Sequence, residues 1–562
     1  MSTERQPRWV GALLGLASMT VGLGLGELIA GLVDSWASPV VSVGDRVIDG
    51  SPAWLKDFAI DALGTNDKPA LVIGTLILLG LVAVLLGMWA CNGKLKLALA
   101  GVAGFAVVGW AAASFDRADS NLLAGMPAVL GGLAAAATMA ALTRTLQPDP
   151  AHGGPPVATS TGKLHGQPLP PQQAPAPEPQ LLDEPRVVTD GYEPAPATPA
   201  FDEAMDRIGA KPSRRSFLLG VGAAGALALT AGAAGRWLRQ RASVAKERAA
   251  VVLGRPASVL PTPPADPAAT TPGLSKLLTP NKDFYRIDTA LTVPNVSTDS
   301  WTLRIHGMVD KELTLTYDQL LKRELFEFDH MLSCVSNTVG GDLAGSARWV
   351  GIRLDDLLNE AGIQPGADQI MGRSVDGFTA GFPTAVLDGR DSIIAVGMNG
   401  EPLPISHGYP ARLVVPGLYG YVSATKWLKE IELTTFADQE GYWIPRGWAV
   451  EAPIKIQSRI DTPKQSIDAG TVAVAGVAWA PLAGVAKVEV QVDDGGWRTA
   501  TLGPELSGTT WRQWWTDWNA KSGTYLLRCR ATDKDGNVQT AQVAPPRPDG
   551  ATGYHEVQVS VS

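Results

Sequence analysis

The chain contains few cysteines: only Cys91, Cys334 and Cys529 occur in 562 residues. Three cysteines exclude a disulfide framework, although a single bridge is open to them. No Cys-x-x-Cys-His segment occurs and no cysteines cluster, so the chain offers no attachment site for a c-type haem and no set of ligands for an iron–sulfur centre. Any redox centre must therefore use few protein ligands.

Concentrated positive charge is also missing. The formal net charge is -8, and no stretch gathers the Lys and Arg side chains that a phosphate-binding face needs. We therefore expect no nucleic acid partner.

Charge is unevenly distributed along the chain. Nearly all long uncharged runs lie before residue 240, whereas alternating, aromatic-rich and charged sequence follows it. This length predicts two or three domains with sizeable cores.

Four apolar runs in residues 1–146 are long enough to cross a bilayer, which takes about 20 residues each. They cover residues 10–33, 69–91, 95–115 and 122–143. The alternative is a soluble bundle of buried helices. Their many Gly and Ala residues suit close helix packing in lipid, so we expect a four-helix transmembrane region.

The charges between these runs predict an orientation. If the runs alternate in direction, the basic residues fall on one side, which the positive-inside rule makes cytoplasmic: Arg5, Arg8, Lys94, Lys96 and Arg144. The opposite loops are rich in aspartate. Glu27 lies within the first run, either as a proton or quinone contact or as a residue near the interface.

Residues 147–212 are rich in Pro and poor in large apolar residues, so we expect a disordered cytoplasmic linker. Arg214 and Arg215 then precede an apolar run, and residues 213–240 resemble a twin-arginine export signal. An ordinary fifth span with flanking arginines is the alternative. Both place everything after residue 240 outside the cytoplasm, where residues 241–272 are expected to form a Pro-rich tether.

Residues 273–464 show short, mixed elements. Residues 301–305 alternate as a strand does, and residues 354–361 read as a helix that ends at Gly362. This mixture predicts an α+β domain.

Several segments of this domain follow one another in a recognisable order. They are 284–286, 293–294, 301–307, 333–337, 347–349, 398–404, 407–412, 415–417 and 426–427. Together they resemble the molybdopterin domain of the sulfite oxidase family. The resemblance begins near Leu274, continues to the C-terminus and does not extend to the membrane half.

Cys334 is the residue on which this resemblance depends. It follows a strand-like segment and opens a polar, Gly-rich loop, residues 336–341, which is a poor place for a core cysteine. By its residue type alone it would be a structural thiol. The resemblance implies that it is the metal ligand, and a soft thiolate suits a molybdenum ion held by the dithiolene of a pterin.

The resemblance also implies residues that contact the cofactor, a pterin with a phosphate that needs cations and amide donors. These are Phe284, Tyr285, Arg286, Ile287, Asp288, Asp376, His407, Arg412, Ser423, Thr425 and Lys426. Arg412 and Lys426 are expected to serve the phosphate, against the alternative of solvated surface cations.

The substrate side departs from the family pattern. The family has an arginine five residues after the ligand cysteine, where this chain has Val339. Arg286, Arg547 and Tyr442 match other residues that the family places about the metal, although Tyr442 is also suited to aromatic packing. One fewer cation favours a neutral or singly charged substrate.

Residues 465–562 have a β pattern. Val488, Val490 and Val492 alternate with polar residues, and Cys529 lies on an apolar face, which predicts a core thiol. The pattern favours an immunoglobulin-like β-sandwich, and the resemblance implies a homodimer through this domain. Four tryptophans are candidates either for that interface or for core packing: Trp511, Trp514, Trp515 and Trp518.

The sequence thus predicts a multi-domain chain with an N-terminal α-helical transmembrane bundle, an external α+β sulfite-oxidase-type domain and a C-terminal sandwich. The resemblance implies a molybdenum–molybdopterin cofactor, two-electron oxygen-atom transfer on a small-molecule substrate, and a separate electron carrier, either a quinone or a haem protein. A reductase of sulfoxides or nitrate and a non-enzymatic membrane receptor are the alternatives.

Overall fold

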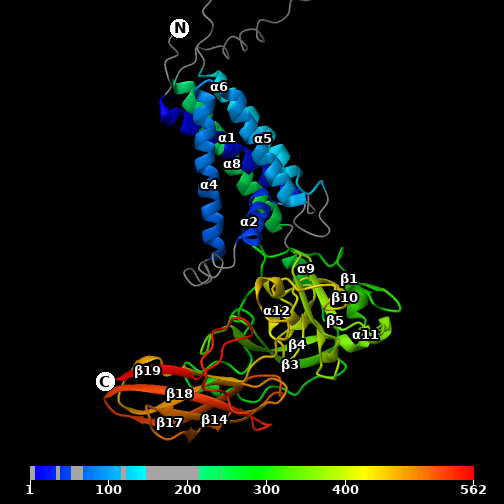
Figure 1. The fold of residues 1–562 in the computed structure, drawn as a ribbon, viewed down its shortest axis with the longest axis vertical. Coiled ribbons are helices and arrows are strands. Elements are labelled where there is room, and N and C mark those ends of the chain that lie inside the picture. Colours follow the sequence, from blue (N-terminus) through cyan, green and yellow to red (C-terminus); the bar gives the residue numbers. More distant parts are fainter. Residues whose placement is uncertain (1–6, 33–37, 52–66, 115–121, 147–213, 242–243) are drawn as a thin grey trace, which may run out of the picture.

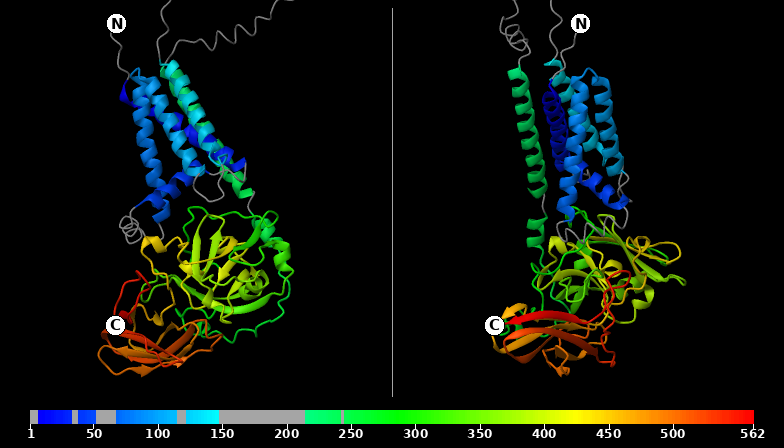
Figure 2. Two further views of the ribbon diagram at one scale, coloured as in Figure 1. Left: turned by 45° about the vertical axis from the view of Figure 1, so that its right-hand side comes forward. Right: turned by 60° about the vertical axis from the view of Figure 1, so that its left-hand side comes forward.

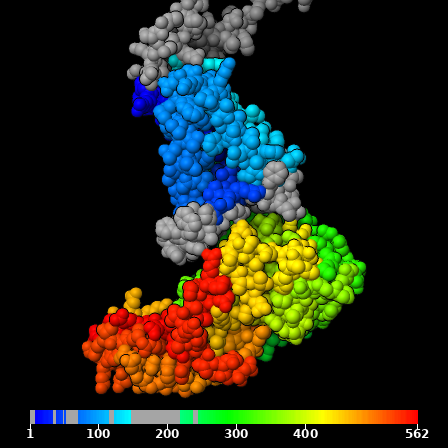
Figure 3. All heavy atoms as spheres, viewed as in Figure 1, coloured from blue at the N-terminus to red at the C-terminus, as the bar shows by residue number. Residues whose placement is uncertain are grey.

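The computed structural model describes residues 7–32, 38–51, 67–114, 122–146, 214–241 and 244–562 (Figure 1). The linker expected at 147–212 lies outside these residues. A helical bundle stands on an α+β domain, and a β-rich domain lies against the side of the latter (Figure 3).

Five described helices are long and apolar enough to cross a membrane. They are α1 (Arg8–Leu32), α4 (Asp67–Cys91), α5 (Leu95–Ser114), α6 (Met126–Arg144) and α8 (Arg214–Arg241). Helix α6 begins at Met126 rather than at residue 122, and Pro127 occupies its first turn, where a missing N–H costs nothing. The twin-arginine-like segment is therefore one of five helices, and Figure 2 shows it running along the bundle.

Glycine allows α1 and α8 to pack closely. A Cβ atom at Gly235 of α8 would lie 2.5 Å from the Glu27 carbonyl oxygen of α1, and one at Gly24 of α1 would collide with the Ala228 carbonyl of α8. Contact between backbones is how small residues stabilise helix pairs in lipid. Helix α8 is thus built into the bundle rather than standing apart from it.

The sequence did not indicate α2 (Pro39–Gly50), a short helix between the bundle and the α+β domain (Figure 1). Gly44 of α2 lies against Leu291, because a Cβ atom at Gly44 would come within 2.7 Å of the Leu291 Cδ1 atom. The bundle therefore contacts the chain segment that follows residues 284–288.

Residues 244–272, expected to be part of a tether, lie along the α+β domain instead. In α9 (Ala245–Ala250), Arg248 donates to the Leu403 carbonyl at 2.6 Å and pairs with Glu401 at 2.9 Å. Further on, the Ala257 amide donates to the Leu325 carbonyl at 2.7 Å. These bonds join the segment to the domain over much of its length, which a freely moving tether would not show.

The α+β domain contains two sheets. One has the order β2-β1-β10-β5-β6, and the other has the order β3-β4-β7-β8 with β9 paired to β7. Their strands are β1 (Thr302–Gly307), β2 (Leu313–Thr316), β3 (Phe326–Ser333), β4 (Ala344–Arg353), β5 (Gln369–Ser374), β6 (Thr379–Pro383), β7 (Ile393–Met398), β8 (Glu401–Pro402), β9 (Arg412–Val414) and β10 (Leu428–Thr434). The strand and helix expected from the sequence are β1 and α11 (Leu354–Ala361), and Gly362 ends α11 with a φ of 72°.

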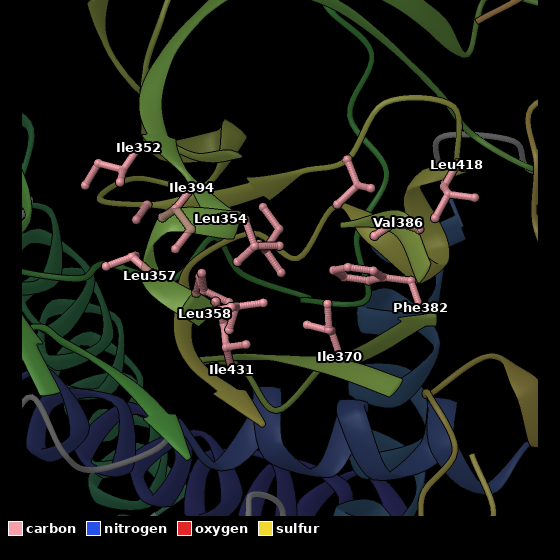
Figure 4. Close-up of a cluster of buried hydrophobic side chains, with 14 of the residues drawn as sticks. Ile352, Leu354, Leu357, Leu358, Ile370, Phe382, Val386, Ile394, Leu418 and Ile431 are labelled. Carbon is pink, nitrogen blue, oxygen red and sulfur yellow. The ribbon is translucent and has the colours of Figure 1, made fainter. Parts of the chain in front are cut away.

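Apolar side chains of both sheets and of α11 form one core. Leu357 and Leu358 of α11 meet Ile370 of β5 and Ile394 of β7 there, all at 0% exposure (Figure 4). Two short helices complete the domain, α10 (Tyr317–Leu321) and α12 (Gly420–Ser423). The core thus fixes the strand ends from which the candidate site is built.

The C-terminal region is a pair of packed sheets. Their orders are β11-β13-β17-β16 and β12-β19-β18-β14-β15. The strands are β11 (Gln457–Thr462), β12 (Gln465–Ile467), β13 (Gly470–Trp479), β14 (Val485–Val492), β15 (Arg498–Thr499), β16 (Thr501–Leu502), β17 (Arg512–Ala520), β18 (Gly523–Asp533) and β19 (His555–Val561). Since β11 belongs to this sandwich, the unit begins before residue 465, where the sequence placed its start.

The interior of the sandwich resolves two expectations about single residues. Cys529 is fully buried between the sheets, which confirms a core thiol. Trp511, Trp514 and Trp518 are also buried, and only Trp515 of the four tryptophans is half-exposed. Most of this aromatic group therefore packs the protein's own interior, while the immunoglobulin-like type of the sandwich stays a prediction.

Candidate functional site

Cys334 lies directly after β3, at the base of a closed loop. Its amide donates to the Leu343 carbonyl at 2.9 Å, and the Asn337 side-chain oxygen accepts from the Leu343 amide at 2.9 Å. The thiol is buried, and it donates to the Ser336 hydroxyl at 3.5 Å. Burial raises the pKa of this thiol, and Ser336 and Lys426 oppose the increase. The structure thus presents a single sulfur atom at the closed end of the predicted polar loop.

A group of cations lies on the same side of the domain. Lys426 donates to Asp288 at 2.7 Å, and Arg286 pairs with the same carboxylate at 2.7 Å. Burial lowers the pKa of Lys426 to about 8, although Asp288 acts in the opposite direction. One carboxylate therefore serves two cations, and an excess of positive charge remains.

Arg412 is the most deeply buried of these cations, at 5% exposure. Its guanidinium donates to the carbonyls of His407 at 3.0 Å and Ala424 at 3.3 Å, and lies over the Trp349 ring at 5.3 Å. No carboxylate pairs with it in the part of the chain that the structure describes. Burial lowers the pKa of Arg412 to about 10.

These observations fit an anionic cofactor with hydrogen-bonding rings. A buried cation with only carbonyl partners is costly unless an anion joins it. In addition, the Asn337 side-chain nitrogen and the Thr425 hydroxyl are buried without a hydrogen-bond partner among the described residues. A pterin phosphate would supply the missing charge, and a metal would use the sulfur of Cys334.

An aromatic wall joins the cysteine to the cations. Phe284 stacks on Tyr285 at 5.3 Å and meets His407 edge to face at 5.7 Å. Burial lowers the pKa of His407 to about 4, with Arg412 contributing, so the imidazole is neutral near pH 7. Burial also raises the pKa of Tyr285, with Cys334 contributing and Arg412 opposing, so the phenol keeps its proton between sulfur and guanidinium.

The other residues that were expected to contact the cofactor differ in their surroundings. The Ser423 hydroxyl donates back to the carbonyls of Leu418 and Tyr419. Asp376 caps the turn after β5 by accepting from the Phe378 amide at 3.2 Å, and Ile287 is 45% exposed at the rim. The structure therefore brings together most of the expected residues, and gives the Ser423 hydroxyl a local structural bond.

Tyr442 and Arg547 form a second cluster with a residue that the sequence did not single out, Arg446. The Arg446 guanidinium lies over the Tyr442 ring at 3.6 Å, and Arg547 donates to the Arg446 carbonyl. Arg547 also lies over Trp448 at 5.9 Å. A cation four residues after an expected active-site tyrosine was the available signal for Arg446. Val339, by contrast, is a half-buried apolar residue of the cysteine loop.

Comparisons with known proteins place these residues in a broader context. A family model described as an oxidoreductase molybdopterin binding domain matches residues 290–443, which include Cys334, Arg412 and Lys426. Mitochondrial sulfite oxidase of Homo sapiens is 29% identical over 341 residues, which are 51% of this chain and 62% of that protein. This chain thus spans less than two thirds of that relative's length.

Two further proteins are similar. The uncharacterized oxidoreductase YuiH of Bacillus subtilis is 30% identical over 148 residues, which are 26% of this chain and 72% of that protein. In the crystal structure of the sulfane dehydrogenase SoxCD from Paracoccus pantotrophus, a chain with 23% identity superposes with a TM-score of 0.46. That superposition covers 51% of this chain and 82% of the other.

Proposed function

Because this chain belongs to the sulfite oxidase family of molybdopterin-dependent oxidoreductases, we propose that it catalyses two-electron oxygen-atom transfer on a small substrate at an extracytoplasmic, membrane-anchored site. The family implies a molybdenum–molybdopterin cofactor. One observation carries the proposal: the buried thiol of Cys334 and the buried guanidinium of Arg412 both act on the Tyr285 phenol, and Arg412 has no carboxylate partner in the described residues.

The residues expected to bind the cofactor would have separate roles. Cys334 would supply one thiolate to the metal, which requires loss of the thiol proton on binding. Arg412 and Lys426 would hold the phosphate, whereas neutral His407 and Tyr285 offer hydrogen bonds to the rings. When bound, the cofactor supplies the two-electron exchange and the oxygen transfer. In the oxidative direction, each turnover takes an oxygen atom from water and releases two protons and two electrons.

The charges favour a neutral or singly charged substrate. Val339 brings no cation to the cysteine loop, and Arg286 shares its charge with Asp288. We propose that Arg286 steers the substrate and that Tyr442, with Arg446 over its ring and Arg547 nearby, positions it or relays a proton. A dianion would bind less tightly here than in a site with the additional arginine.

Anchoring in the membrane rests on the five apolar helices and on the basic residues between them. Because α8 packs backbone to backbone against α1, we propose that the twin-arginine-like helix is retained as an anchor and places the catalytic half outside the cytoplasm. Contact between α2 and Leu291 favours an electron carrier at the membrane, either a quinone or a haem protein.

We also propose a homodimer through the C-terminal domain, and this part of the proposal rests on the family alone. Trp515 is the half-exposed member of the four tryptophans and the one available to such an interface. The mass of the purified protein in detergent, corrected for bound detergent, tests it.

The deciding experiment compares wild-type protein with Cys334→Ser, both prepared from cells that synthesise the cofactor. We expect molybdenum in the wild type and its loss, or loss of its thiolate spectrum, in the variant. Cys91→Ser is the matched control, since Cys91 lies in α4 and should not affect metal content. Equal molybdenum in wild type and Cys334→Ser, with the same spectrum, would overturn the proposal.

The direction of the reaction needs a second assay. Loaded protein is offered sulfite with an oxidant dye, and sulfoxide or nitrate with a reductant dye. Turnover only with the oxidant supports the oxidase, and turnover only with the reductant identifies a reductase of the same fold. Molybdenum-free wild-type protein would favour the non-enzymatic receptor.

A further inference from the structure

The C-terminal sandwich is bonded to the chain on both sides of Cys334. On the upstream side, the contacts are with β3, which ends at Ser333. The Thr509 carbonyl accepts from the Met331 amide at 3.0 Å, and the Thr509 hydroxyl lies 2.7 Å from the His330 Nδ1 atom. Thr509 belongs to the loop between β16 and β17 of the sandwich.

The Thr509 hydroxyl contacts two residues of β3, His330 and Asp329. The His330 Nε2 atom faces the Asp391 carbonyl at 3.2 Å, so that nitrogen carries the ring proton. The Thr509 hydroxyl then has two acceptors within reach, the His330 Nδ1 atom at 2.7 Å and the Asp329 carbonyl at 3.0 Å. Ser507 of the same loop donates to the Asp329 carbonyl at 2.6 Å. One loop of the sandwich therefore forms hydrogen bonds along β3, the strand that ends next to Cys334.

On the downstream side, the contacts are with the Gly-rich part of the cysteine loop. Arg459 of β11 donates to the Gly341 carbonyl at 2.7 Å and to the Ser275 hydroxyl at 2.8 Å. Asp461 holds the same guanidinium at 2.7 Å. The arginine and the aspartate are buried at 8% and 5% exposure, so water competes little for these bonds.

His555 of β19 packs against Gly340 of the same loop. A Cβ atom at Gly340 would collide with the His555 ring, and Gly340 has a φ of 78°, so only glycine fits there. The ring is itself held, because its Nδ1 atom accepts from the Ile460 amide at 2.9 Å. The loop thus cannot move toward the sandwich without displacing a fixed imidazole.

We propose that Thr509, Arg459 and His555 are positioning residues for the Cys334 sulfur, so that the sandwich completes the metal site instead of serving only as a separate module. The inference rests on the proposed function for its metal, but its geometry is independent of it. Cys334 lies between two fastened segments and is tied to Leu343 by its own amide, so its sulfur has little freedom. Groups that orient a ligand in this way tune a bound metal without touching it.

The test uses full-length protein in detergent with two test variants, each paired with a control variant. Thr509→Val removes the hydroxyl contacts to His330 and to the Asp329 carbonyl while keeping the side-chain shape. Thr510→Val is its control, because the Thr510 hydroxyl donates within its own loop, to the Ser507 carbonyl. Arg459→Gln removes the bonds to Gly341 and Ser275. Its control is Arg512→Gln, which loses two carbonyl contacts inside the sandwich, to Gly503 and Val485.

The first readout needs no cofactor. Protein from molybdate-starved cells is alkylated with iodoacetamide, and labelling of the Cys334 peptide is followed by mass spectrometry. We expect Thr509→Val and Arg459→Gln to label about tenfold faster than wild type, since each releases one side of the loop. The two control variants should label at the wild-type rate, even if their thermal stability falls.

The second readout is the molybdenum signature of loaded protein. We expect the midpoint potential and the sulfur-to-metal absorption band to shift in Thr509→Val and Arg459→Gln but not in the controls. Arg459→Lys, which keeps one donor for Gly341, should restore part of both. Unchanged labelling and an unchanged signature in Thr509→Val would overturn the inference. Accelerated labelling in a protein that never takes up molybdenum would support the positioning and reject the proposed function instead.

Discussion

Replacing Arg412 with methionine separates what the buried cation costs the stability of the fold from what it contributes to cofactor binding. The pKa of Arg412 falls to about 10, because burial disfavours the charged form. At 1.36 kcal/mol per pKa unit, that charge costs the cofactor-free fold about 3 kcal/mol at neutral pH. For a base with a depressed pKa, the cost is present at every pH below the folded value, so it applies throughout the physiological range.

The expected result differs between the two forms of the protein. In cofactor-free protein, Arg412→Met removes the charge but leaves the carbonyls of His407 and Ala424 without a donor, at about 1–3 kcal/mol each. We therefore expect only a small net change in the free energy of unfolding. In loaded protein, the phosphate loses a charged hydrogen bond of about 1.5–3 kcal/mol, which weakens cofactor retention about 10- to 100-fold.

Two measurements check this. Molybdenum per protein is determined after extensive gel filtration, and Tm is compared between loaded and molybdate-starved preparations. A ligand that binds only the folded state raises Tm, and the rise should shrink in Arg412→Met. Arg373→Met is the control, because it breaks an ion pair with Glu432 between β5 and β10 and should weaken both forms equally. A full cofactor-dependent rise in Tm with undiminished molybdenum in Arg412→Met would refute the reasoning.

Three further outcomes follow from charge and protonation. Val339→Arg should lower KM for a dianionic substrate such as sulfite about tenfold, measured by steady-state turnover, and an unchanged KM would argue that the loop does not face the substrate. Cofactor uptake should decline as the pH rises through about 8, because Lys426 then loses its proton. Asp288→Asn should move that decline to lower pH, because it removes the carboxylate that raises the pKa of Lys426. As the pH is lowered from 6 to 5, the free energy of unfolding should fall by about 3–4 kcal/mol, because three imidazoles bind protons in the unfolded chain but stay neutral in the folded one. A Tm that does not change over this pH range would contradict this. The three imidazoles, each with its pKa lowered to about 4, are His330, His407 and His555.

Local patterns in the sequence were sufficient for many elements. Hydrophobic runs of membrane length located the five helices, and Gly362 marked the end of α11 because a left-handed backbone stops a helix. The cysteine loop was also visible, since a polar, Gly-rich stretch after a strand is a poor core. Resemblance rather than periodicity indicated Arg412 and Lys426.

Other features depended on distant contacts and left little local trace. Residues 244–272 look like a Pro-rich tether, yet side chains such as Arg248 bind partners more than 150 positions away. Helix α2 is too short to be recognised by hydropathy, and its position is decided by contact with Leu291. Arg446 became relevant only when the fold placed it over the Tyr442 ring.

By itself, the sequence determined which segments are apolar, where the chain turns and that Cys334 opens a polar, Gly-rich loop, because these depend on neighbouring residues. The tertiary structure alone decided that Arg412 is buried without a carboxylate in the described residues, and that Arg459, Thr509 and His555 hold the segments around Cys334. The physical reason is that desolvation and hydrogen bonding between residues far apart in the chain arise only once the domains have packed together.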